Sequence, residues 1–149
     1  MKETRLNTLI KKILLGVFTI MVVFSFNSCA KKVSFLTSSV APAARGYVKV
    51  KKDNNKNYVI QIQVEYLAEV SRLQPTMQTY VVWMVTDREI TKNIGRLNSS
   101  TKHFSNKLYA SFETVSSFKP IKIFITAEVD ESAQTPGEQV VLSTDKFWD

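Results

Sequence analysis

The sequence is poor in the residues that most often build catalytic and metal sites. Among 149 residues it has one cysteine, one histidine and four glycines. One cysteine excludes an intramolecular disulfide, and with a single histidine the chain lacks the usual ligand set of a structural zinc site. The G-x-S-x-G elbow of serine hydrolases is also absent from the sequence. We therefore expect no metal and no cofactor, and a fold that is stabilised by its hydrophobic core alone.

The single cysteine, Cys29, follows a segment with the layout of a bacterial export signal. Basic residues precede an apolar run over residues 13–26, and Ser28 stands directly before the cysteine. The run is shorter than the roughly 20 apolar residues of a membrane-spanning helix. This order is typical of a lipoprotein signal peptide, whose removal makes the cysteine the first residue, carrying acyl chains. We predict a signal peptide over residues 1–28 and a lipidated Cys29; an uncleaved signal anchor, or cleavage that leaves a free thiol, is the alternative.

The positive charge of the chain lies close to this predicted anchor. Without residues 1–28 the chain keeps 16 basic and 12 acidic side chains, and residues 31–56 hold seven of the basic ones against Asp53 alone. Anionic head groups attract such side chains by about 1 kcal/mol each near a bilayer surface. A solvated linker and strand edge is the alternative, and nucleic acid is not an expected partner, because no aromatic–basic recognition motif is present. The predicted membrane-surface contacts are Lys31, Lys32, Lys49, Lys51 and Lys52.

Hydrophobic residues recur with a period of two over most of the remaining chain, which indicates β-strands. Residues 58–66 alternate cleanly and predict a hairpin with residues 47–51 around the Asp-Asn turn at 53–57. Residues 80–85 are apolar on both faces and predict a central strand. Weaker strands are expected at about 90–97 and 106–115, then at 121–127 and 139–143. Only residues 67–73 suit a helical turn.

This pattern predicts one all-β domain. About seven short strands with little helix favour an immunoglobulin-like antiparallel β-sandwich over residues 45–149, with a small closed barrel as the alternative. Residues 29–44 are expected to form a lipidated tether. Trp83 lies in the doubly apolar strand and is predicted to be buried, as tryptophans are in such sandwiches.

The chain ends with an aromatic pair, Phe147 and Trp148. An exposed pair at a chain end would suit a partner contact or a membrane interface, and packing back onto the sandwich is the alternative.

The acidic residues of the chain are the basis for an alternative, enzymatic function. Asp87 and Glu89 follow the central strand, and Asp130 and Glu131 follow a later one. A glycosidase needs two carboxyl groups about 5 to 10 Å apart, so an envelope glycan hydrolase is the alternative function. The only histidine, His103, is expected in an exposed loop.

Two stretches carry a family pattern. One is Tyr-Val-Val-Trp-Met-Val-Thr-Asp at 80–87, followed by Asn-Ile-Gly-Arg-Leu at 93–97; the other is Phe-Ile-Thr-Ala-Glu-Val at 124–129 with Thr-Pro-Gly-Glu-Gln-Val-Val-Leu-Ser at 135–143. They resemble the extracytoplasmic, C-terminal domain of anti-sigma-K factors over about residues 45–145. The resemblance implies a β-sandwich outside the cytoplasm, with no catalytic residues. It does not imply sigma-factor binding, because the cytoplasmic sigma-binding domain of that family is not expected here.

The whole sequence is similar to small envelope lipoproteins of the Bacteroidetes type. In that group surface export follows an acidic run after the lipidated cysteine, whereas here Ala30-Lys31-Lys32 follows it. We therefore expect a periplasm-facing, lipid-anchored, non-enzymatic module with a binding, sensory or structural role. Its expected partners are the membrane, through Cys29, and an envelope protein or polysaccharide.

Overall fold

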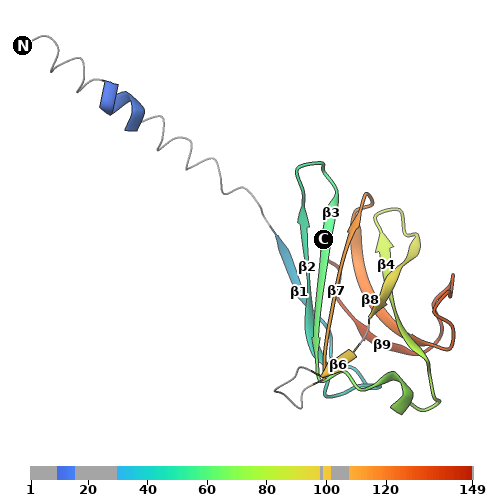
Figure 1. The fold of residues 1–149 in the computed structure, drawn as a ribbon. Coiled ribbons are helices and arrows are strands. Elements are labelled where there is room, and N and C mark those ends of the chain that lie inside the picture. Colours follow the sequence, from blue (N-terminus) through green and yellow to red (C-terminus); the bar gives the residue numbers. More distant parts are fainter. Residues whose placement is uncertain (1–9, 16–29, 98, 102–107, 149) are drawn as a thin grey trace, which may run out of the picture.

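The computed structural model describes residues 10–15, 30–97, 99–101 and 108–148 (Figure 1). Residues 10–15 form a short helix within the predicted signal peptide. No helix in the described ranges is long and apolar enough to cross a membrane. Cys29 and His103 both lie outside these ranges, so the predictions for them stay predictions.

The described residues form nine strands in two packed antiparallel sheets, which confirms the predicted all-β sandwich (Figure 1). The only helical element of the sandwich in these ranges is the short 3-10 turn η2 (Val70–Arg72), within the predicted helical segment. One sheet has the order β1-β2-β3-β7-β6 and the other β5-β4-β8-β9. The strands are β1 (Lys31–Ser34), β2 (Arg45–Lys52), β3 (Tyr58–Glu65), β4 (Thr79–Thr86), β5 (Thr91–Leu97), β6 (Ser99–Thr101), β7 (Leu108–Ser116), β8 (Pro120–Glu128) and β9 (Val140–Ser143).

The strand order is that of an immunoglobulin-like Greek key. When β1 is set aside and the next eight strands are lettered A, B, C, C′, D, E, F and G, the sheets read A-B-E-D and C′-C-F-G. The inward side chains follow the period of two that the sequence shows. On β3, for example, Ile60, Ile62 and Val64 are at most 1% exposed, and the residues between them face outward.

The structure corrects the predicted tether, because residues 31–44 belong to the sandwich. Strand β1 pairs with β2 along its full length, from Lys31 opposite Val50 to Ser34 opposite Tyr47. The chain then crosses to the other sheet, where the Leu36 amide donates to the Ser143 carbonyl at 2.9 Å. This segment therefore closes one edge between the two sheets. Its lysines and serines suggest a linker. An edge strand needs few apolar contacts, however, so a polar composition does not exclude a strand.

Trp83 is fully buried, as predicted, but it lies on the outer face of its sheet. Its neighbours Val82 and Met84 face the other sheet, whereas the Trp83 ring stacks on Phe124 of β8 with centroids 6.4 Å apart. The loop after β8 covers this face, since the Asn93 side chain on β5 donates to the Ala133 carbonyl at 3.0 Å. A second, smaller buried cluster therefore exists outside the main core.

Hydrogen bonds satisfy the polar groups of this outer cluster. The indole of Trp83 donates to the Thr126 hydroxyl at 2.7 Å, and that hydroxyl donates to the Glu128 carboxylate at 2.5 Å. The same carboxylate oxygen accepts the Gly137 amide at 2.7 Å. Because Glu128 is only 8% exposed, these bonds offset the cost of burying a polar group. They also attach the loop between β8 and β9 to the sheet.

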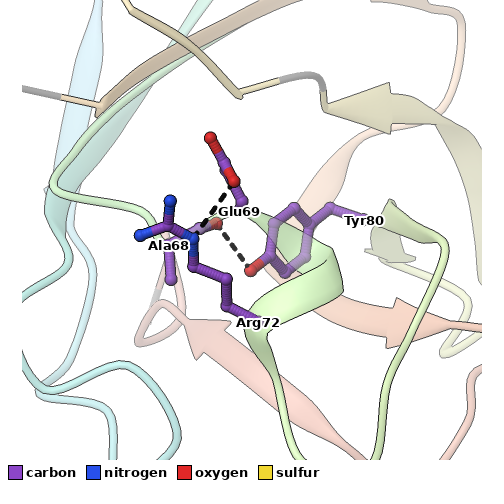
Figure 2. Close-up of polar contacts among 4 residues, drawn as sticks. All are labelled: Ala68, Glu69, Arg72 and Tyr80. Atoms are coloured by element: carbon purple, nitrogen blue, oxygen red, sulfur yellow. Dashed lines mark hydrogen bonds and ion pairs between the residues drawn. The ribbon is translucent and has the colours of Figure 1, made fainter.

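The connection between β3 and β4, at the same end of the sandwich, is fixed by Tyr80 (Figure 2). The Tyr80 hydroxyl donates to the Ala68 carbonyl at 2.9 Å, and Glu69 and Arg72 form an ion pair at 3.1 Å on the same segment. Tyr80 is 1% exposed, and this burial raises its pKa to about 12. One buried hydroxyl thus joins the crossing segment to the central strand.

Candidate functional site

A hollow of about 380 Å³ opens at the end of the sandwich where β2 ends and β8 begins. Three lysines and two aromatic rings line it, together with one apolar residue of the core. We call it the basic–aromatic hollow. Its lining residues are Val50, Lys51, Lys52, Tyr58, Lys119 and Trp148.

The β2–β3 hairpin positions one wall of the hollow. The strand register places Lys52 directly opposite Tyr58, and the ammonium of Lys52 lies 5.3 Å from the centre of the Tyr58 ring. The turn beyond them is fixed by Asp53, whose carboxylate accepts the amides of Asn55 and Asn57 at 2.9 and 2.8 Å. This is the local bonding for which Asp and Asn are favoured in turns.

The end of the chain forms the other wall. The Phe147 amide donates to the Ile121 carbonyl at 2.8 Å, and the Trp148 indole donates to the Pro120 carbonyl at 2.9 Å. These bonds hold the Trp148 ring beside Lys119, whose ammonium lies 5.2 Å from the ring centre. The wall is therefore an ordered part of the sandwich.

The predicted aromatic pair separates into two roles. Phe147 is 1% exposed and belongs to the core between the sheets, which corrects the expectation that it contacts a partner. Trp148 is half-buried and lines the hollow. The two neighbouring side chains thus point to different places, Phe147 into the core and Trp148 into the hollow.

The predicted lysines also separate. Lys51 and Lys52 line the hollow, and Lys31 is at the same end of the sheet because it pairs with Val50. Lys32 and Lys49 pair with each other on the outward face of the five-stranded sheet. There the ammonium of Lys32 lies 3.7 Å from the centre of the Tyr47 ring.

The described lining of the hollow holds three lysines and no acidic residue. None of its three lysines forms an ion pair within the described ranges, where the only ion pairs join Arg72 to Glu69 and Arg96 to Glu131. Unneutralised ammonium groups in a concave site attract anions more strongly than the same charges spread over a flat surface. The arrangement can therefore bind an anionic group, and it offers cation–π contacts that hold the ammonium groups in place.

The carboxylates of the hydrolase alternative do not come together. Thr86 of β4 pairs with Pro120 and Thr79 pairs with Glu128, so the turn after β4 and the loop after β8 lie at opposite ends of these strands. Eight residues of strand span roughly 25 Å, which separates Asp87 and Glu89 from Asp130 and Glu131 by more than a glycosidase pair allows.

The acidic side chains after β8 have local partners. Hydrogen bonds from the Ser132 amide and hydroxyl, both 2.8 Å long, lower the pKa of Asp130, and Glu131 pairs with Arg96. Across the parts of the chain that the structure describes, no three His, Cys, Asp or Glu side chains gather closely enough to hold a metal ion.

Sequence reasoning missed Lys119 and Tyr58 as parts of the site. Lys119 stands alone before Pro120, and only the packing of the C-terminus brings Trp148 to it. Tyr58 was assigned to the hairpin, but nothing in its strand pattern shows that its ring edges a cavity.

Comparison of the chain with protein-family models, with curated proteins and with solved structures finds no match in any of the three.

Proposed function

We propose that this chain is a lipid-anchored, non-enzymatic β-sandwich module of the bacterial cell envelope, facing the periplasm. Its ligand would bind at the membrane-proximal end, in the basic–aromatic hollow. The export signal and Cys29 suggest the lipid anchor, and one geometric observation, the position of strand β1, supports the orientation.

That observation is the short distance between the predicted anchor and the sandwich. Strand β1 begins at Lys31, two residues after Cys29, and Lys31 pairs with Val50 at the rim of the hollow. Two residues of extended chain span at most about 7 Å. Acyl chains on Cys29 would therefore hold this end of the sandwich at the bilayer surface.

The distribution of charge and aromatic residues supports the same orientation. Lys51, Lys52 and Trp148 lie at the end that the anchor would hold. Lysines are attracted to anionic head groups, and tryptophan favours the boundary between water and lipid, where its ring is apolar and its N–H is wet. The same side chains at the far end would give the anchor no assistance.

A binding role is favoured over the hydrolase alternative. The four carboxylates of that alternative are divided between the two ends of the sandwich, and none of them lines the hollow. A sensory role, by analogy with anti-sigma-K factors, stays a prediction that rests on short motifs.

The experiment that tests the proposal is metabolic labelling with palmitate. The wild-type protein should incorporate the label and fractionate with membranes, whereas Cys29→Ala should do neither. Ser28→Ala keeps a small residue before the cysteine and serves as the matched control, which should still be labelled. Recovery of unlabelled wild-type protein in the soluble fraction would contradict the proposal.

A further inference from the structure

We propose that the basic–aromatic hollow binds the phosphate of an anionic lipid head group. This inference names the ligand of the site described above and rests on the proposed anchoring at Cys29. The charge, the size and the position of the hollow all favour the same kind of ligand.

The charges indicate a phosphate. Three lysines, Lys51, Lys52 and Lys119, line one concave surface to which no acidic residue in the described part of the chain contributes. Asp53, which follows Lys52 in the sequence, uses its carboxylate in the hairpin turn, where it accepts three hydrogen bonds from Asn55 and Asn57. Lysine binds phosphate as a point charge, so several lysines around one hollow suit a compact anion whose oxygens point in several directions.

The aromatic rings organise the lysines for this ligand. Tyr58 and Trp148 each have an ammonium group about 5 Å from the ring centre, which restricts the positions of Lys52 and Lys119. Trp148 is itself fixed by its bond to the Pro120 carbonyl. Lysine side chains that are ordered before binding lose less conformational entropy when the ligand arrives.

The same contacts argue against a sugar chain as the ligand. A sugar would stack on the free face of an aromatic ring, but here an ammonium group already occupies one face of each ring. The volume of about 380 Å³ is also at the small end of ligand sites, which suits one head group.

Position decides between a lipid phosphate and a free one. Because Lys31 pairs with Val50, an anchor on Cys29, two residues earlier in the chain, would lie beside the hollow. A protein held there by acyl chains meets head groups at a high effective concentration, whereas a dissolved phosphate has no such advantage.

The test uses the full chain in a nonionic detergent, with Trp148 fluorescence as the signal. The ligands are short-chain phosphatidylglycerol, short-chain phosphatidylcholine, glycerol phosphate and a sulfated oligosaccharide. Trp148→Phe assigns the signal, since the other tryptophan, Trp83, is fully buried. Lys52→Gln and Lys119→Gln each remove one charge from the hollow. Arg45→Gln removes one exposed charge at the opposite end of β2 and is the matched control.

We expect phosphatidylglycerol to bind more tightly than the other three ligands. Each lysine variant should weaken its binding about fivefold, whereas Arg45→Gln should leave it unchanged. Equal binding of phosphatidylcholine, equal or tighter binding of glycerol phosphate or the oligosaccharide, or an equal loss in Arg45→Gln would each overturn the inference. Palmitate labelling is independent of these variants, so failure of the lipid assignment is distinguishable from failure of the anchor.

Discussion

At the scale of single residues, the Tyr80 hydroxyl has an unusually large structural role. It joins the central strand β4 to the segment before it by donating to the Ala68 carbonyl, while the ring lies in the main core. A phenolate in this position would lose both the hydrogen bond and its hydration. That is why burial raises the pKa of Tyr80 to about 12.

We predict that the stability which Tyr80 supplies is lost at high pH. In the unfolded chain Tyr80 ionises near its ordinary pKa of about 10, but in the folded protein it stays neutral until about pH 12. Its contribution is therefore complete below about pH 10 and disappears as the pH rises towards 12. Denaturation by urea, measured at several pH values, should show a steeper loss for the wild type than for Tyr80→Phe. Parallel curves would contradict this prediction.

The same variant reports on the hydrogen bond at neutral pH. Tyr80→Phe should lower the free energy of unfolding by about 1 kcal/mol, because the Ala68 carbonyl then loses its partner. Ring packing is unchanged in this variant, so the difference isolates the hydroxyl. A value near zero would mean that water replaces the hydroxyl without loss.

At the scale of elements, strand β5 shows how closely the two sheets approach at one edge. Its register with β4 shifts between Val82, which pairs with Gly95, and Trp83, which pairs with Asn93. Gly95 has φ of +141°, and a Cβ at this position would lie 2.6 Å from the Phe112 ring on β7. The bulge thus brings β5 against the other sheet at a point where only glycine fits.

We predict that Gly95→Ala destabilises the sandwich by about 2 to 4 kcal/mol. The added methyl group collides with Phe112, and the backbone angle is unfavourable for any side chain. Thr91→Ala, on the same strand, is the control and should cost about 1 kcal/mol or less. Chemical denaturation measures both variants. Equal stability of the two would show that β5 moves away from Phe112 without loss.

The sequence predicts well those strands in which the burial of one or both faces sets a clear pattern of apolar residues. Residues 58–65 alternate because one face is buried, and residues 80–85 are apolar throughout because both faces are covered. Strand β1 was missed because an edge strand needs few buried side chains, and its composition is that of a linker. The hollow was only partly predictable. Lys51, Lys52 and Trp148 were singled out separately, but their meeting depends on packing between distant segments.

At the scale of the whole molecule, the two ends of the sandwich differ in character (Figure 1). One end carries the start of β1, the β2–β3 turn and the basic–aromatic hollow. The other carries η2, the segment fixed by Tyr80 and the loop that covers Trp83. A predicted anchor two residues before β1 would therefore orient the whole sandwich, with the end that carries η2 directed away from the bilayer.

A flexible spacer tests this orientation. Ten residues of Gly and Ser inserted after Ala30 should leave acylation of Cys29 intact but allow the sandwich to leave the surface. Such a spacer has an end-to-end distance of roughly 17 Å, well beyond the screening length of about 8 Å at physiological salt. Quenching of Trp148 by brominated lipids, taken as the difference from Trp148→Phe, should fall in the spacer variant. The same insertion between Gln134 and Thr135, at the far end, should leave it unchanged. If Trp148 is quenched equally in both insertions, the short attachment does not set the orientation.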